Sequence, residues 1–378
     1  MTTASPSPSG PVGSGPVGVG LIGAGTISAE YLRNLTSFPD VAVRVIGDLV
    51  PEAAKARAAE FGIPACGTPQ EVLEDEGVEI VVNLTIPTAH HDVSLAALRA
   101  GKHVWTEKPI STVPADAREL LDVAREHGLR VGGAPDTVLG AGVQTGLRTL
   151  REGRVGPLAS ALTLFQSPGP ENWHPNPAFL FQEGAGPLYD IAPYYLGTLV
   201  LALGPVERVA AVGSRARDER EIGSGPKAGE TFPVTVPTQV AALLTFASGQ
   251  NATVLLSFDS PHTRTGFVEV YGADGTLALP DPNVFDGSSR VTAYRGTDAQ
   301  EIAAVGATTG RGLGVLEMAR ALRAGVPHRA QGEIAAHVLD VMVAIETAIA
   351  EGSVLEIDSR FAPVEPMPED FDPFGSTL

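Results

Sequence analysis

Lys108 is a side chain whose position in the sequence suits it to move a proton. The run HVWT at residues 103–106 predicts a short strand, and Glu107, Lys108 and Pro109 follow it directly. Ligands of open parallel sheets bind outside the carboxyl ends of the strands, so Lys108 is expected at a ligand site. Partial burial there disfavours the ammonium form and lowers the pKa of the amine toward neutrality, as a proton relay requires. The alternative is an ordinary solvated surface lysine.

Asp190 and Tyr194 form a second candidate pair. The apolar pattern over residues 188–203 predicts one helix, interrupted by Pro193, and residues four apart share a helical face. An unpaired carboxylate on such an apolar helix is costly, which argues against a purely structural Asp190. A tyrosine near a lysine can exchange a proton with a substrate hydroxyl, and a carboxylate can hold the neighbouring hydroxyl. Packing within the helix is the alternative for Tyr194.

These side chains depend on an element near the start of the chain. Residues 17–22 are apolar and predict a buried strand, which ends at Gly23 and Gly25 before a helical pattern begins at Thr26 and Ile27. Strand, glycine turn and helix together form a dinucleotide-binding fingerprint. Gly23 permits the tight turn, Gly25 lets the backbone approach a pyrophosphate, and the start of the helix faces that anion.

The fingerprint can be placed in two registers. Gly18, Gly20 and Gly23 spell GxGxxG literally, but the first two lie inside the predicted strand, with no helix after them. Gly23, Gly25 and Ser28 lie at the turn itself, where Ser28 is small enough for helix and strand to pack closely. The sequence favours this second register. The alternative is a glycine-rich turn that binds nothing.

Asp48 indicates which dinucleotide is bound. The next predicted strand, residues 41–46, leads to Asp48, about 20 residues beyond the fingerprint. An acid at this place accepts a hydrogen bond from the ribose 2′-OH and repels a 2′-phosphate. No arginine occurs in residues 49–52. The sequence therefore predicts NAD rather than NADP, and the positive nicotinamide would further disfavour an ammonium at Lys108.

Composition narrows the class of protein. The chain has 378 residues, 43% of them hydrophobic, and a formal net charge of −18 from 26 basic and 44 acidic residues. Such an excess of acid argues against nucleic acid and anionic membranes as partners. The single cysteine, Cys66, fits a reducing, cytoplasmic location and is expected in the core rather than as a nucleophile. The sequence contains no HxH, CxxC or HExxH motif, so no metal site is predicted.

The chain divides into four predicted segments. Residues 1–16 predict a disordered leader, and residues 17–133 alternate strands and helices, as a doubly wound Rossmann domain does. Residues 134–361 predict an α+β domain for substrate binding and oligomerisation, with a mostly antiparallel open sheet and helices on one face. Residues 362–378 predict a tail, either an arm or disordered. The uncovered sheet face predicts a homodimer or homotetramer.

Taken together, these motifs resemble the Gfo/Idh/MocA oxidoreductases, which include glucose–fructose oxidoreductase and inositol dehydrogenases. The resemblance covers nearly the whole chain. Four segments carry it: the fingerprint at Gly23, the turn from Thr85 to His90, GKHV leading into EKP at residues 101–109, and GAGPLYD at residues 184–190. It implies that Thr85, His90, Glu107 and Lys108 lie at the cofactor, with Glu107 on the nicotinamide ribose. Capping of the following helix is the alternative for His90. Many family members have histidine where this chain has Tyr194.

The predicted function is NAD-dependent hydride transfer to or from a secondary hydroxyl or ketone of a cyclic polyol or sugar. Lys108 and Tyr194 would take the hydroxyl proton, and which of them is the immediate base stays open. Asp190 would orient the substrate, and the loop with Trp173 and His174 either binds sugar or is an ordinary surface loop. The alternatives are redox-assisted glycoside cleavage with bound NAD, and a non-catalytic NAD-binding regulator.

Overall fold

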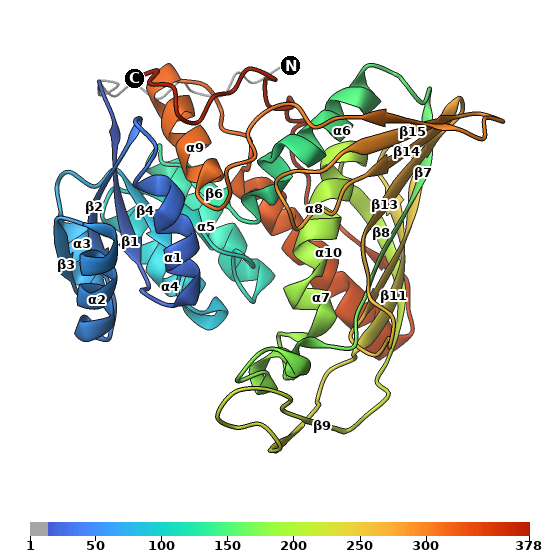
Figure 1. The fold of residues 1–378 in the computed structure, drawn as a ribbon, viewed down its shortest axis with the longest axis horizontal. Coiled ribbons are helices and arrows are strands. Elements are labelled where there is room, and N and C mark those ends of the chain that lie inside the picture. The colour runs from blue at the N-terminus through green and yellow to red at the C-terminus, as the bar shows by residue number, and fades with distance from the viewer. Residues whose placement is uncertain (1–13) are drawn as a thin grey trace. The chain divides into compact units, whose positions relative to one another are not determined.

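The computed structural model describes residues 14–378, so most of the predicted leader lies outside the described residues. The chain forms two compact units, coloured along the sequence in Figure 1. The described part of the first unit comprises residues 14–139, 309–336 and 370–378. The second comprises residues 140–308 and 337–369.

The first unit contains a six-stranded parallel sheet in the order β3-β2-β1-β4-β5-β6. Its strands are β1 (Val17–Ile22), β2 (Val41–Gly47), β3 (Ala65–Gly67), β4 (Ile80–Asn83), β5 (His103–Thr106) and β6 (Val131–Gly133). The predicted doubly wound Rossmann sheet is confirmed. Strand order reverses between β1 and β4, which is the place where such sheets bind their ligands.

The helices of this unit cover the sheet with their apolar faces. They are α1 (Thr26–Leu35), α2 (Pro51–Phe61), α3 (Pro69–Glu74), α4 (His90–Arg99), α5 (Pro114–Glu126) and α9 (Leu313–Ala324), with the 3₁₀ turns η1 (Pro87–Ala89) and η2 (Asp136–Leu139). On α1 the buried residues include Tyr31, Leu32 and Leu35, at the helical spacing that the sequence predicts. Helix α9 comes from far along the chain and packs on α1 and β6.

The second unit contains a nine-stranded mixed sheet in the order β16-β15-β14-β13-β7-β12-β11-β8-β17. Its strands are β7 (Leu158–Gln166), β8 (Val206–Ser214), β11 (Gln239–Phe246), β12 (Asn251–Ser257), β13 (Arg264–Gly272), β14 (Gly275–Leu279), β15 (Ser289–Ala293), β16 (Ala299–Ile302) and β17 (Leu355–Glu356). Two hairpins form in this sheet, with Leu243 opposite Thr253 and Tyr271 opposite Thr276. Among the described strands of this sheet, β7 and β12 are the one pair that runs parallel.

Helices lie on one face of this sheet, as predicted (Figure 1). They are α6 (Ala141–Arg151), α7 (Gly186–Asp190), α8 (Ala192–Leu203) and α10 (Gly332–Glu351), whose first residues belong to the other unit. The single helix predicted over residues 188–203 is wrong, because the helix breaks at Ile191. Pro193 has no N–H to donate to the carbonyl four residues earlier, and its ring clashes with that carbonyl in a continuous helix.

The structure corrects the prediction for Cys66 and decides between the two predictions for the C-terminal tail. Cys66, expected in the core, is exposed in β3, a short edge strand. The polar, glycine-rich region 218–232 is not simply an exposed loop, because it contains the strands β9 (Glu219–Glu221) and β10 (Thr231–Pro233) and a buried Arg220. The C-terminal tail is an arm, with Thr377 hydrogen-bonded to the buried Asp40.

Candidate active site

The glycine turn adopts the geometry that the second register predicts. Gly23 has φ +105°, and a Cβ there would lie 2.6 Å from the carbonyl oxygen of Leu84. A Cβ on Gly25 would meet only open space, so the backbone of this residue is accessible to a ligand. Gly18 and Gly20 lie inside β1 in tight contact with their neighbours, which explains why the literal GxGxxG register does not form the turn.

The start of α1 suits an anion. Thr26 and Ile27 begin the helix and are at least partly exposed, while Ser28 behind them is buried. Within the described residues of its first turn, α1 has neither a side-chain N-cap nor an acidic group. The free N–H groups and the positive end of the helix dipole therefore face outward without competition, which fits the pyrophosphate of a dinucleotide.

Asp48 lies directly after β2 and is tied to the glycine turn. One carboxylate oxygen accepts the N–H of Ala24 at 2.7 Å, and the other accepts that of Val50 at 2.8 Å. The carboxylate is half-buried and has further lone pairs, so it can still accept a hydrogen bond from a ribose hydroxyl. Its place at the end of the second strand is the one that the sequence predicts for a ribose-binding acid.

His90 holds the turns that follow β4 and β5. Its side chain is 1% exposed, and its two ring nitrogens face the carbonyl oxygens of Pro109, at 2.6 Å, and Thr85, at 3.1 Å. Burial lowers the pKa of His90, against the opposing effect of these two carbonyls. The hydroxyl of Thr85 donates to Asn83 at 2.6 Å. His90 does not cap α4; it connects the two turns and thereby supports the backbone at Lys108.

Glu107 and Lys108 leave the carboxyl end of β5 together. Glu107 is 9% exposed, and one of its oxygens accepts the hydroxyl proton of Tyr31 at 2.8 Å. The other accepts the backbone N–H of Lys108 at 3.0 Å. Lys108 is half-buried at this edge of the sheet. The sequence gives no signal for this role of Tyr31, because an aromatic side chain at helical spacing is also typical of a core residue.

The second unit holds the other predicted catalytic side chains. Asp190 is the last residue of α7 and is half-buried, and Tyr194 lies in the first turn of α8 and is buried. Because the helix breaks between them, their four-residue spacing does not by itself place them on one helical face. The hydroxyl of the neighbouring Tyr195 accepts the N–H of Gly266 at 2.9 Å, which attaches α8 to β13.

Trp173 and His174 lie on a loop of the second unit that also includes Phe179. The rings of His174 and Trp173 are 5.6 Å apart, and those of His174 and Phe179 are 5.5 Å apart, both edge to face. Trp173 is 70% exposed and Phe179 53% exposed, so their faces are open to a ligand. The sequence suggested the first two aromatic groups but gave no signal for the third.

The base of this loop is anchored by a buried ion-pair cluster that the sequence did not reveal. Arg220 is 4% exposed and pairs with Glu171 and with Asp259. Its guanidinium also lies 4.8 Å from the centre of the Phe181 ring. Breaking a buried charge pair by removing one partner is strongly destabilising, so the cluster holds the aromatic loop in place.

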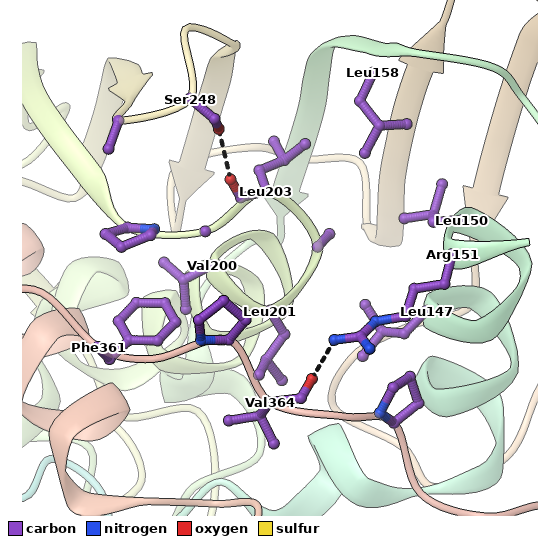
Figure 2. A pocket seen from close by; sticks show the side chains of 16 residues that line it. Leu147, Leu150, Arg151, Leu158, Val200, Leu201, Leu203, Ser248, Phe361 and Val364 are labelled. Atoms are coloured by element: carbon purple, nitrogen blue, oxygen red, sulfur yellow. Dashed lines mark hydrogen bonds between the residues drawn. The ribbon is translucent and has the colours of Figure 1, made fainter. Parts of the chain in front are cut away.

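A cavity of about 600 Å³ lies elsewhere in the second unit, at the C-terminal end of α8 (Figure 2). Among the described residues that line it, Arg151 is the single ionisable one, and its guanidinium donates to the carbonyl of Val364 at 2.6 Å. Ser248 likewise donates to the carbonyl of Leu203 at 3.1 Å. The cavity is otherwise mainly apolar, and its described lining contains none of the side chains that the sequence predicts to be catalytic.

Within residues 14–378, no group of three or more His, Cys, Asp or Glu side chains could hold a metal ion. None of the helices in the same range is long and apolar enough to cross a membrane.

The sheet order, the glycine turn, the uncapped helix and the acid after β2 define the class of this protein. It is a dinucleotide-binding protein with a Rossmann domain and a second, α+β unit. Residues 17–133 match the sequence profile described as an oxidoreductase family, NAD-binding Rossmann fold, and residues 143–278 match the GFO/IDH/MocA C-terminal domain. The chain belongs to the Gfo/Idh/MocA oxidoreductase family, and its first unit is the NAD-binding domain.

Individual relatives agree with this assignment. The chain is 31% identical over 233 residues to 1,5-anhydro-D-fructose reductase of Ensifer adhaerens, which covers 60% of this chain and 64% of the relative. It is 25% identical over 265 residues to levoglucosan dehydrogenase of Pseudarthrobacter phenanthrenivorans, which covers 64% of this chain and 66% of the relative. The chain thus spans just under two thirds of the length of these two relatives.

Solved structures show the same fold across most of the chain. A levoglucosan dehydrogenase in complex with NADH and L-sorbose matches with a TM-score of 0.80 at 20% identity, covering 91% of this chain and 99% of that one. An NAD-binding oxidoreductase from Klebsiella pneumoniae matches with a TM-score of 0.80 at 21% identity, covering 91% and 100%. At this level of identity the likeness establishes the fold.

Proposed function

We propose that this protein transfers hydride between NAD and a secondary hydroxyl or ketone of a cyclic polyol or sugar. The observation that carries the proposal is the carboxyl edge of the parallel sheet. Lys108 leaves this edge beside Glu107, in the same sheet whose first turn and second strand present Gly25 and Asp48. An acid–base group at the ligand-binding edge of a nucleotide-binding sheet suits dehydrogenation.

The proposed roles follow from the chemistry of the side chains. Bound NAD supplies the hydride acceptor in the oxidative direction and the hydride donor in the reductive one. Lys108 and Tyr194 take the hydroxyl proton as the carbonyl forms, or return it when the carbonyl is reduced. Asp190 holds a neighbouring hydroxyl, and the exposed Trp173 stacks on an apolar sugar face with His174 beside it. The names of the two relatives above, both sugar enzymes, support this substrate class.

The preference for NAD over NADP rests on Asp48. Its carboxylate is fixed by two backbone N–H groups, at the end of the strand where a ribose-binding acid is expected to repel a 2′-phosphate. Thr26 and Ile27 bind the pyrophosphate through their backbone, and Thr85, His90 and Glu107 shape the nicotinamide end. A cytoplasmic location remains a prediction, which rests on the use of a single cysteine.

A homodimer or homotetramer is proposed to form through the open sheet face. The side chains of Val212, Ala241, Leu255, Leu164 and Phe267 are paired across β8, β11, β12, β7 and β13, and together they form an apolar row. Each of them is at least partly exposed, and the helices lie on the other face (Figure 1). A continuous exposed apolar surface of this kind is typical of a contact between protein chains. A monomeric mass by light scattering at micromolar concentration would contradict it.

The test of the activity is a substrate panel. Inositols, pyranoses and anhydro-sugars, each supplied with NAD, are followed at 340 nm, and the corresponding ketones are supplied with NADH. Turnover with stoichiometric change in free NADH supports a dehydrogenase. Cleavage of a glycoside without accumulation of NADH would instead establish the redox-assisted reaction. NADH binding without turnover of any compound would favour a regulator.

A further inference from the structure

Tyr31 connects two parts of the NAD-binding unit that are far apart in sequence. It lies on α1, the helix whose first turn faces the pyrophosphate site, and its side chain is completely buried. Its hydroxyl lies 2.8 Å from an oxygen of Glu107, 76 residues further along the chain. The indole N–H of Trp105, on β5, lies 3.2 Å from the same hydroxyl.

The direction of this hydrogen-bond chain is determined by its members. Trp105 has an N–H that can only donate, so the oxygen of Tyr31 is the acceptor in that bond. Burial raises the pKa of Tyr31 well above its ordinary value, and the nearby charges of Glu107 and Asp136 raise it further, so the hydroxyl stays protonated. Its single proton is therefore donated to Glu107.

Asp136 does not compete for this proton. It is completely buried, and it accepts the backbone N–H groups of Gly312, at 2.7 Å, and Gly314, at 3.3 Å, at the start of α9. The guanidinium of Arg311 lies 3.4 Å from its other oxygen. Asp136 is thus held by a different helix, and the Tyr31 hydroxyl serves Glu107 alone.

Glu107 is held through both of its oxygens, one by Tyr31 and the other by the backbone N–H of Lys108. Two fixed donors define the plane of a carboxylate, which has about four lone-pair positions, so acceptor capacity remains for a ligand. A carboxylate oriented before the ligand arrives binds it more tightly than one that must be ordered on binding.

We propose that Tyr31 is a positioning residue that orients the Glu107 carboxylate toward the nicotinamide-side ribose of the bound dinucleotide. This inference rests on the proposed function, which places Glu107 at that ribose. Because Tyr31 also belongs to the helix at the pyrophosphate, it links the two ends of the cofactor site. The link gives a reason for a tyrosine hydroxyl on the buried face of α1, which also carries Leu32 and Leu35.

The test compares two probes that differ only at the nicotinamide end. NADH contains the nicotinamide ribose, whereas ADP ends at the pyrophosphate, and both are titrated against the full chain, NADH by its fluorescence and ADP by calorimetry. In Tyr31→Phe the dissociation constant of NADH should rise about three- to tenfold, as expected for one lost hydrogen bond, with that of ADP unchanged. Glu107→Gln should show the same pattern. The dissociation constant of NADH for the double variant should be little higher than that for the weaker-binding single variant.

A matched control is available in the other unit. Tyr271 donates to Glu269 at 2.7 Å, so Tyr271→Phe removes a tyrosine–carboxylate bond of the same kind, and both dissociation constants should stay at the wild-type value. Equal weakening of NADH and ADP in Tyr31→Phe would show that Tyr31 only supports α1, and would overturn the inference. So would unchanged NADH binding. Failure of the wild-type chain to bind NADH would instead refute the proposed function.

If Tyr31→Phe does not fold, Trp105→Phe provides the second variant. It leaves the bond from Tyr31 to Glu107 in place and removes only the donor behind it. The NADH dissociation constant should then rise less than about threefold, with ADP again unchanged. In this variant too, a larger rise in the dissociation constant of ADP than in that of NADH would overturn the inference.

Discussion

Replacing Asp48 by Asn should change both the stability of the first unit and its choice of cofactor. The carboxylate accepts the N–H of Ala24 through one oxygen and that of Val50 through the other. The amide of Asn keeps one acceptor oxygen and presents a donor to the second N–H. A hydrogen bond to a charged group contributes about 1.5–3 kcal/mol, and the half-buried site argues for the lower end. A loss of about 1.5 kcal/mol corresponds to a fall in Tm of about 3–6 °C for a unit of this size.

The cofactor effect follows from the lost charge. Two unit charges about 4 Å apart repel by about 1 kcal/mol even in water, and more beside a protein surface. The ratio of the NADPH to the NADH dissociation constant should therefore fall at least about fivefold in Asp48→Asn. Both cofactors are titrated by fluorescence.

The control for this experiment is Asp75→Asn. Asp75 also accepts a backbone N–H, from Gly77 at 2.8 Å, but it precedes β4 and so lies at the amino end of the sheet. This variant should lose stability, but the ratio of its NADPH to its NADH dissociation constant should not change. An unchanged ratio in Asp48→Asn, or tighter binding of NADPH by the wild-type chain, would refute the reasoning.

Three further predictions concern catalysis, pH and assembly. Lys108→Ala and Tyr194→Phe should each lower turnover by about 10²–10⁴-fold with little change in NADH affinity. Lys108→Arg should not restore turnover, because a guanidinium does not release its proton. Unchanged turnover in Tyr194→Phe would show that this residue only packs within its helix. Burial, helped by nearby arginines, lowers the pKa of His328 and His337 to about 4, so the unfolded chain takes up protons first as pH falls below about 6.5. The free energy of unfolding should then decrease between about pH 6.5 and 4, by up to about 2 kcal/mol per histidine at pH 5, and equal urea midpoints at pH 7 and 5 would contradict this. Leu243→Asp, on the exposed sheet face, should shift the mass measured by light scattering toward the monomer while the Tm of the chain stays nearly the same.

The sequence by itself determined the local elements of the cofactor site. Gly23 needs a positive φ that only glycine adopts easily, so the turn could be placed from residue type alone. The next strand ends directly before Asp48, and the strand at residues 103–106 ends just before Glu107 and Lys108. Both ends could be placed because strands follow from short apolar runs. The turn between β11 and β12 could also be placed locally, since Gly249 there has φ +95°, a conformation that glycine adopts easily.

Only the tertiary structure decided the contacts between distant segments. The bond from Tyr31 to Glu107 and the anchoring of Asp136 on α9 join residues that are 76 and 176 positions apart, and no local pattern encodes such pairs. Arg220 lies in a polar, glycine-rich stretch that sequence composition assigns to solvent, yet its charge is compensated in the interior by two acids. Periodicity reports which face of a segment is buried, whereas the partner that meets a polar group there depends on how whole elements pack.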